Sequence, residues 1–218
     1  MSIVAIDGPA SSGKSSVGIR VAAALGCGFL DTGLLYRAVT AAALVDGALA
    51  DEAALAALAG STSVHMAPDG VAISVAGRTF DPASLESAAV ERAVPAVAAI
   101  PSVRAALRSV QRAAAAGGSG VLAGRDIGTV VLPEADWKFF LDASAESRAL
   151  RRARQRGYAE GSAEHQSILA DLIARDREDR GRVVAPLVAA PDAILVATDD
   201  LSLDQVVDRL VETVHRGA

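Results

Sequence analysis

The chain is poor in cysteine, lysine and aromatic residues, and it has no long apolar run. Its one cysteine, Cys27, excludes a disulfide within the chain and a cysteine-based zinc cluster. The longest apolar stretches, such as residues 38–45, reach about half of the roughly 20 residues that a membrane span requires. The N-terminal sequence MSIVAIDGPA lacks the basic segment of a signal sequence. We therefore expect a cytoplasmic protein with no membrane partner and with Cys27 buried.

Charge and composition narrow the function classes further. The chain has 21 basic and 26 acidic residues and a net charge of −5, which argues against binding along a nucleic-acid backbone. Hydrophobic residues make up 51% of the 218 residues, a composition that excludes a disordered or low-complexity chain. The length fits one α/β domain with room for a small insertion.

Arginine provides almost all of the positive charge, since Lys14 and Lys138 are the only lysines. Nine arginines fall in two short segments, residues 148–156 and 175–182. The planar guanidinium group suits bidentate binding of phosphate and carboxylate groups. A GC-rich genome also favours arginine and alanine, so the arginine content alone decides nothing.

The first 45 residues alternate between short apolar runs and helical patterns. Residues 2–7 (SIVAID) are apolar up to a final acid, which is typical of a buried parallel strand. We predict a helix over 15–25, a second strand over 29–31, and a helix that Thr32 caps and that runs to about residue 45. This order is the signature of a parallel α/β sheet.

The pattern then changes. Residues 64–75 alternate apolar and polar side chains around a Pro-Asp-Gly turn, which predicts an antiparallel hairpin with 78–80 as a candidate third strand. Helices are predicted over 81–94 and 101–116. The remaining predictions are strands at 120–123, 138–142 and 193–197 and helices at 143–156, 163–180 and 203–215. The fold class is therefore α/β, one domain over 1–218 with a five-stranded parallel sheet flanked by helices and an insertion.

The strongest motif is GPASSGKS at residues 8–15, a full match to the phosphate-binding pattern GxxxxGK[ST] between a strand and a helix. Backbone N–H groups of such a loop converge on phosphate oxygens, Lys14 reaches the terminal phosphates, and Ser15 coordinates Mg²⁺. This composition gives roughly 0.002 such matches by chance in a chain of this length. The sequence therefore predicts phosphate binding.

The loop alone does not identify a reaction, because GTPases, ATPase motors and small-molecule kinases share it. A switch GTPase needs a base-reading NKxD element, and the second lysine, Lys138, lies in WKFF. Transfer between two phosphorylated substrates needs converging cations and exclusion of water, which arginine-rich helices can supply. A kinase for a phosphorylated acceptor is favoured. A kinase for another small acceptor, such as a different nucleoside monophosphate or shikimate, and a nucleotide-binding regulatory module stay open as alternatives.

Further motifs extend along the chain. They are DTGLLYR at 31–37, PSVR at 101–104, GRDIGTVVLP at 124–133, FLDAS at 140–144 and RDREDRGRVVAPL at 175–187. With these motifs nearly the whole chain resembles the P-loop nucleoside monophosphate kinases, and among them the bacterial cytidylate kinases. The resemblance implies that family's fold, with core segments of about 1–61, 117–145 and 183–218, a monophosphate-binding insertion at 62–104 and an arginine-rich lid at 148–165.

The resemblance also implies an activity. The chain would transfer the γ-phosphoryl group of ATP to CMP and dCMP, giving ADP with CDP or dCDP, in pyrimidine nucleotide metabolism. Its cofactor would be Mg²⁺. Its partners would be these small molecules and no nucleic acid, and it would act as a monomer.

The same resemblance carries site residues onto this chain. The ATP-binding residues would be Gly8, Pro9, Ala10, Ser11, Ser12, Gly13, Lys14, Ser15 and Ser16, with Ser15 as the metal ligand. The CMP-binding residues would be Thr32, Arg37, Arg104, Arg125, Asp126, Arg175, Asp179 and Arg182. The catalytic residues would be Lys14, Arg37, Arg125, Arg148, Arg151, Arg152 and Arg182. The spacing of the last three CMP residues places them on one helical face, which agrees with a shared ligand.

One assignment has two interpretations, and three positions depart from the family pattern. Asp126 either orders a water on Mg²⁺ or pairs with an arginine. The chain has Pro95 where the family commonly has a serine that contacts cytosine, Glu86 where an arginine is common, and Ala123 where some members have an acid. These changes concern contacts to the base, and loss of one hydrogen bond can relax the preference for CMP over UMP.

Overall fold

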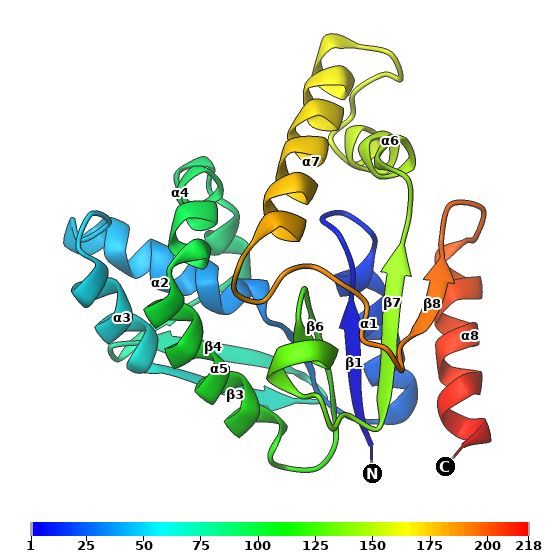
Figure 1. The fold of residues 1–218 in the computed structure, drawn as a ribbon, viewed down its shortest axis with the longest axis horizontal. Helices are drawn as coiled ribbons and strands as arrows, with labels where there is room; N and C mark the ends of the chain where they lie inside the picture. The colour runs from blue at the N-terminus through cyan, green and yellow to red at the C-terminus, as the bar shows by residue number, and fades with distance from the viewer. Residues whose placement is uncertain (1, 218) are drawn as a thin grey trace.

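A five-stranded parallel sheet forms the centre of the computed structural model, which describes residues 2–217 (Figure 1). Its strand order is β2-β6-β1-β7-β8, and every neighbouring pair is parallel. The strands are β1 (Ile3–Asp7), β2 (Phe29–Asp31), β6 (Gly120–Gly124), β7 (Trp137–Asp142) and β8 (Ile194–Ala197). The five predicted core strands are confirmed, and their carboxyl ends meet at one edge of the sheet.

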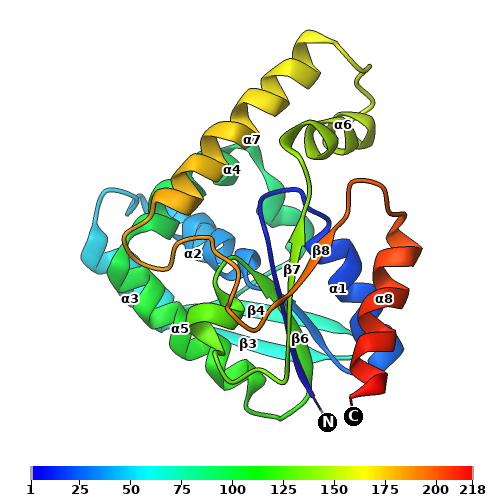
Figure 2. The same ribbon diagram turned by 45° about the vertical axis from the view of Figure 1, so that its right-hand side comes forward.

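Helices cover both faces of this sheet (Figure 2). On one face α1 (Lys14–Leu25) packs against α8 (Leu203–Arg216), and Val4 and Ile6 of β1 belong to the apolar cluster between these helices and the sheet. Ala5 of β1 belongs to the cluster on the opposite face. Because both faces of β1 are covered, the strand is apolar at successive positions and does not alternate with polar residues.

A second, antiparallel sheet lies beside the first. It consists of β3 (Thr62–Ala67), β4 (Gly70–Val75) and β5 (Arg78–Phe80), paired in that order. The predicted hairpin and its candidate third strand are therefore confirmed. This sheet packs against α2 (Gly33–Asp46), the helix that follows β2.

One helix in this region was not predicted from the sequence. It is α3 (Glu52–Gly60), which packs against α5 (Pro101–Ala115). The carboxylate of Asp51 caps α3 by accepting a hydrogen bond from the Ala54 N–H at 3.0 Å. An acidic cap followed by an alanine and leucine run is a helix signal that the sequence does contain.

The predicted helix over 81–94 has the wrong bounds. The chain forms a 3₁₀ helix, η1 (Pro82–Glu86), and then α4 (Ala88–Ala99), with Ser87 capping α4 between them. Pro95 lies inside α4 and costs it one backbone hydrogen bond, since proline has no N–H donor.

Within residues 2–217 no single helix is long and apolar enough to cross a membrane, although α4 and α5, which meet at 96°, pass that test as a bent pair.

Thr32 precedes α2 as predicted, but its side chain does not cap the helix. The Thr32 hydroxyl donates to the carbonyl oxygen of Ala123, at the end of β6, over 2.9 Å. The carboxylate of Asp31 instead accepts the N–H of Gly33 at 2.9 Å. Thr32 therefore ties the start of α2 to the sheet because the ends of β2 and β6 lie side by side.

Two helices stand above the carboxyl edge of the main sheet (Figures 1 and 2). They are α6 (Ala145–Gln155) and α7 (Ala163–Gly181), which pack along each other and agree with the predicted ranges to within two residues. Ala149 of α6 and Leu172 of α7 share an apolar cluster with Ala10, a residue of the loop after β1. The helix pair thus contacts that loop directly.

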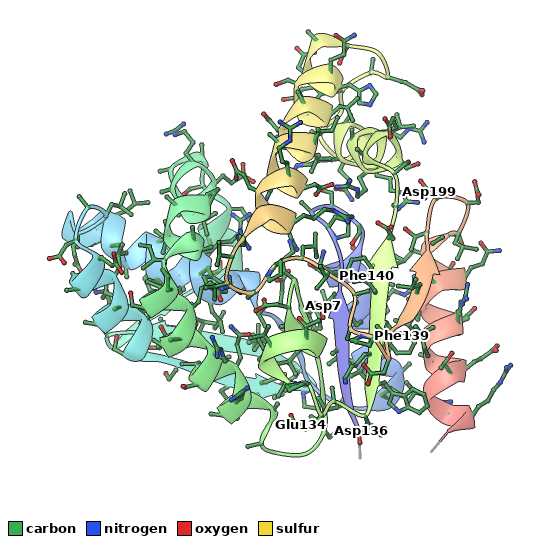
Figure 3. All side chains as sticks on the ribbon, in the orientation of Figure 1. Asp7, Glu134, Asp136, Phe139, Phe140 and Asp199 are labelled. Carbon is green, nitrogen blue, oxygen red and sulfur yellow. The ribbon has the colours of Figure 1, made fainter. Side chains whose placement is uncertain are left out.

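Asp7, which Figure 3 labels at the end of β1, holds the segment after β6 in place through two hydrogen bonds. Its two carboxylate oxygens accept the N–H groups of Ile127 at 2.8 Å and Gly128 at 2.7 Å. These residues begin η2 (Ile127–Val131), a single π-helical turn that the sequence analysis does not predict. Asp7 therefore sets the position of the segment that follows β6, which includes Arg125.

Burial raises the pKa of Asp7 from 3.8 to about 6, although its two N–H donors lower it in part. Between these values the folded protein binds a proton that the unfolded chain releases, so the Asp7 contribution to stability decreases as pH rises from about 4 to 6. We expect a total decrease of about 3 kcal/mol, since one pKa unit corresponds to about 1.4 kcal/mol.

Asp7→Asn cannot ionise and should lack this decrease. Between pH 4 and pH 7 the unfolding free energy of Asp7→Asn, measured in urea, should therefore rise by about 2 kcal/mol relative to that of the unaltered protein. Asp69→Asn, in the exposed turn between β3 and β4, controls for the loss of one charge. A difference between Asp7→Asn and the unaltered protein that stays constant with pH would contradict the shift.

Two helical glycines offer a matched test of packing. A Cβ atom on Gly18 of α1 would lie 2.2 Å from the ring of Phe29, whereas a Cβ on Gly60 would meet nothing within 4 Å. We expect Gly18→Ala to lower the unfolding free energy by about 1–3 kcal/mol through overpacking. Gly60→Ala should leave it unchanged or raise it by up to about 1 kcal/mol. Urea unfolding of both variants checks this, and equal effects at the two positions would show that the ring of Phe29 yields freely.

Candidate functional site

The predicted phosphate-binding loop joins β1 to α1 at the centre of the sheet. Gly8 adopts a φ of 150°, and a Cβ atom there would lie 2.2 Å from the carbonyl oxygen of Leu141, so only glycine fits. The Lys14 ammonium group folds over the loop and donates to the carbonyl of Pro9 at 2.6 Å and to the hydroxyl of Ser12 at 3.3 Å. The strand, loop and helix that the motif requires are thus all present.

Lys14 is 8% exposed. Burial lowers its pKa well below the usual value, and the positive charge of Arg125 lowers it further. The acidic groups near Lys14 therefore do not offset the cost of burying its charged ammonium group. An anion placed at the loop would stabilise that charge, so the loop is suited to a phosphate group.

Ser15 and Asp31 place oxygen atoms together next to the loop. The Ser15 hydroxyl donates to the Asp31 carboxylate at 2.5 Å. Mg²⁺ prefers oxygen ligands and is commonly held by one or two protein groups together with phosphates and waters. The described residues contain no cluster of three or more acidic, histidine or cysteine side chains for a metal. Ser15 and Asp31 fit a magnesium ion that binds together with a nucleotide.

Two adjoining cavities open at the carboxyl edge of the sheet, between α4, the loop after β1 and α7. The first cavity is lined by all eight predicted CMP-binding residues, which are Thr32, Arg37, Arg104, Arg125, Asp126, Arg175, Asp179 and Arg182. The second cavity has a volume of about 500 Å³. From the predicted ATP-binding and catalytic sets it is lined by Ala10, Ser11, Lys14, Ser15, Arg37, Arg125 and Arg152.

Three arginines line both cavities and so occupy their common wall. They are Arg37 of α2, Arg125 after β6 and Arg175 of α7. Burial lowers the pKa of Arg175, and the charge of Arg125 adds to this effect. Within residues 2–217 no carboxylate forms an ion pair with Arg175. A phosphate group at the common wall would meet three guanidinium groups from three separate elements.

Asp179 lies between two arginines of the first cavity. Its carboxylate accepts from Arg125 at 2.7 Å and pairs with Arg182 at 2.6 Å. Burial of this carboxyl favours protonation, but the charges of Arg125 and Arg182 hold the pKa of Asp179 below its usual value. Asp179 is therefore a charged acceptor that also orients both guanidinium groups.

Arg104 and Asp126 form a second buried pair in the same cavity, with 2.7 Å between Arg104 Nη2 and Asp126 Oδ2. The Arg104 guanidinium also lies 5.5 Å from the ring centre of Tyr36 and donates to the Ala98 carbonyl at 3.3 Å. Its Nε is buried without a partner among the described residues. Asp126 therefore pairs with an arginine, which is one of the two roles that the sequence predicts for it.

The three predicted lid arginines differ in their surroundings. Arg152 lines the second cavity and approaches the hydroxyl of Ser11 at 3.4 Å. Arg148 is buried, donates to the carbonyl of Ala10 at 2.9 Å and pairs with Asp176. Arg151 donates to the Thr198 carbonyl beyond the end of β8. The structure therefore brings Arg152, and neither of the other two, to the lining of the cavities.

Sequence reasoning missed three residues of this region. Asp31 is part of the DTGLLYR motif, and its position at the end of a predicted strand was a signal of a functional role. Asp7 carries a similar signal, an acid between a buried strand and the phosphate loop. Glu91 of α4 lines the second cavity and lies near three arginines, but no local pattern marks it.

Comparison with known proteins agrees with this geometry. Residues 4–216 match the family model described as cytidylate kinase. A cytidylate kinase of Mycobacterium avium is 47% identical over 218 residues, which cover 98% of this chain and 95% of the relative. A cytidylate kinase of Azorhizobium caulinodans is 45% identical over 215 residues, which cover 98% of each.

Among solved structures, an uncharacterized protein from Eubacterium ventriosum aligns over 99% of both chains with a TM-score of 0.55 and 12% sequence identity. That similarity concerns the fold alone. The family model, by contrast, covers residues 4–216, and the two relatives are 47% and 45% identical over 98% of the chain. The chain belongs to the cytidylate kinase family.

Proposed function

We propose that this chain transfers the γ-phosphoryl group of ATP to CMP and dCMP, giving ADP with CDP or dCDP. The observation that carries the proposal is the common wall of the two cavities, where Arg37, Arg125 and Arg175 meet. One cavity begins at the phosphate-binding loop, and the other contains polar groups suited to a base and a sugar. A phosphoryl group that passes between nucleotides in these cavities crosses that wall.

The donor side of the proposal rests on residues 8–16. Backbone N–H groups of the loop and the Lys14 ammonium would bind the phosphates of ATP. Ser15 and Asp31 would hold Mg²⁺ with those phosphates, and the ion would neutralise part of their charge. Arg152 would approach the same phosphates from α6, since it already lies at 3.4 Å from Ser11.

The acceptor side needs no strong general base, because a phosphate oxygen of CMP is already ionised near pH 7. Catalysis then consists of alignment and stabilisation of the charge that builds on the transferring group. Arg37 and Arg125 would hold the acceptor phosphate, with Arg182 next to them through Asp179. Asp179 would bind the sugar and Arg104 the base, while Arg175 would contact the transferring phosphoryl group at the common wall together with Arg37 and Arg125.

Arg148 and Arg151 enter the proposal as positioning residues. Arg148 joins the Ala10 carbonyl of the phosphate-binding loop to Asp176 of α7, so it holds the two helices above the loop. Arg151 joins α6 to the chain after β8. The proposal also includes a monomer that acts in pyrimidine nucleotide metabolism in the cytoplasm, and the free thiol of Cys27 fits a reducing compartment.

A coupled assay of ADP release tests the function directly. The acceptors would be CMP, dCMP, UMP, AMP, GMP and shikimate, each with ATP and Mg²⁺. We expect the highest kcat/KM for CMP or dCMP. UMP is the closest competitor, because Pro95 and Val94 line the first cavity without offering a side-chain hydrogen bond to the base. Preference for a purine nucleotide or shikimate, or ATP binding without transfer to any acceptor, would overturn the proposal.

The arginines assigned to the acceptor phosphate give a second test. Arg37→Ala and Arg125→Ala should each lower kcat/KM for CMP by roughly 10- to 100-fold, since a charge-assisted hydrogen bond contributes about 1.5–3 kcal/mol. Affinity for ATP, measured by calorimetry, should change much less. Arg177→Ala is the matched control, because Arg177 is an exposed arginine of α7 outside both cavity linings. Equal losses for ATP and CMP would remove these two arginines from the acceptor site.

A further inference from the structure

Glu91 extends from α4 to the edge of the second cavity and lies near three arginines at once. Its Oε1 atom is 3.1 Å from Arg152 Nη2 and 4.0 Å from Arg37 Nη2, and its Oε2 atom is 3.5 Å from Arg156 Nη2. Arg37 belongs to α2, while Arg152 and Arg156 belong to α6 and its C-terminal cap. One carboxylate therefore joins the insertion to two other parts of the molecule.

The charges that line the second cavity show which groups the Glu91 carboxylate acts on. Six cationic side chains line this cavity, which are Lys14, Arg37, Arg125, Arg152, Arg156 and Arg175. Without a bound phosphate these groups repel one another. The acids Asp31, Glu91, Asp171 and Glu178 also line the cavity, and Glu91 is the one whose carboxylate lies within 4.0 Å of Arg37, Arg152 and Arg156, so it offsets part of their charge.

A carboxylate and a phosphate present similar oxygen atoms to a guanidinium group and bind it through the same N–H donors. Glu91 is therefore a chemical substitute for a phosphate at these arginines. The side chains of Glu91, Arg37, Arg152 and Arg156 are 35%, 20%, 34% and 42% exposed. An incoming ligand can reach the pairs and replace them.

Arg152 also connects this cluster to the phosphate-binding loop. While its Nη2 faces Glu91, its Nη1 approaches the hydroxyl of Ser11 at 3.4 Å. The guanidinium group that holds the carboxylate thus already faces the loop. A phosphate bound at the loop and the Glu91 carboxylate would compete for one group.

We propose that Glu91 is a positioning residue that holds Arg37, Arg152 and Arg156 in the substrate-free protein and competes with nucleotide phosphates for them. This inference rests on the proposed function for the identity of the ligand. Glu91 keeps the arginines assembled on the correct side of the cavity. It also weakens nucleotide binding, because its ion pairs must break when phosphates arrive.

Glu91→Gln tests this role, because it keeps the shape of the side chain and removes its charge. We expect this variant to bind ATP about three- to tenfold more tightly in calorimetry, given the modest strength of partly exposed ion pairs. KM for CMP should fall in the same direction. In the absence of nucleotide, the amides of residues 145–155 should exchange hydrogen faster than in the unaltered protein, and saturating ATP should abolish that difference.

Asp171→Asn is the matched control. Asp171 lines the same cavity and is exposed, and no cation among the described residues forms an ion pair with it. Its substitution removes one negative charge without releasing an arginine, so we expect at most a twofold change in ATP affinity and unchanged exchange in α6. An equal gain in ATP affinity in both variants would show that only the loss of one negative charge matters, and it would overturn the proposal.

Two further outcomes would also overturn it. Weaker ATP binding by Glu91→Gln would show that the carboxylate assists the ligand, and a lower melting temperature with unchanged affinity would show a structural role only. If Glu91→Gln does not fold, Glu91→Asp retains the charge but shortens its reach, and it should act in the same direction. Binding of ATP is measured without an acceptor, so failure of CMP turnover in the unaltered protein would refute the proposed function and leave this test intact.

Discussion

Mutual repulsion among cations is the constraint on which this site depends. Phosphoryl transfer between two anions needs several positive groups at one place, and the second cavity collects six of them. Folding must hold those groups together before any phosphate is present. The structure does so by giving most of the arginines a carboxylate or carbonyl partner in the protein.

The carboxylate partners of these arginines differ in burial and in their distance from the guanidinium groups. Asp126 and Asp179 are buried carboxylates, and they pair with Arg104, Arg125 and Arg182 at 2.6–2.7 Å in the first cavity. Glu91 is partly exposed, and its contacts with arginines are longer. Buried pairs are costly to break, whereas exposed pairs exchange partners readily. The molecule thus combines short ion pairs on buried carboxylates in the first cavity with longer, more exposed pairs around Glu91 at the second.

The main sheet brings the charged residues of the two cavities together, because the segments that carry several of them follow neighbouring strands. The loop after β1, the start of α2 after β2 and the segment after β6 all leave the same edge, because the strands are parallel and adjacent. Asp7 adds a fixed link between the end of β1 and η2. As a result, Lys14 and Arg125 approach each other although they are more than a hundred positions apart in the chain.

The sequence alone determined the main sheet, the small antiparallel sheet and the phosphate-binding loop, because apolar runs, a Pro-Asp-Gly turn and a glycine-rich motif act locally. Through resemblance to known motifs it also identified eight residues that together line the first cavity. It missed α3, although Asp51 is a capping signal, and it predicted one helix over 81–94 where the chain forms η1 (Pro82–Glu86) and then α4 (Ala88–Ala99). The tertiary structure decided which side chains meet: Thr32 with Ala123, Arg148 with Ala10, and Glu91 with three arginines. Such contacts join residues from separate elements, and only the packing of those elements brings their charges within reach of one another.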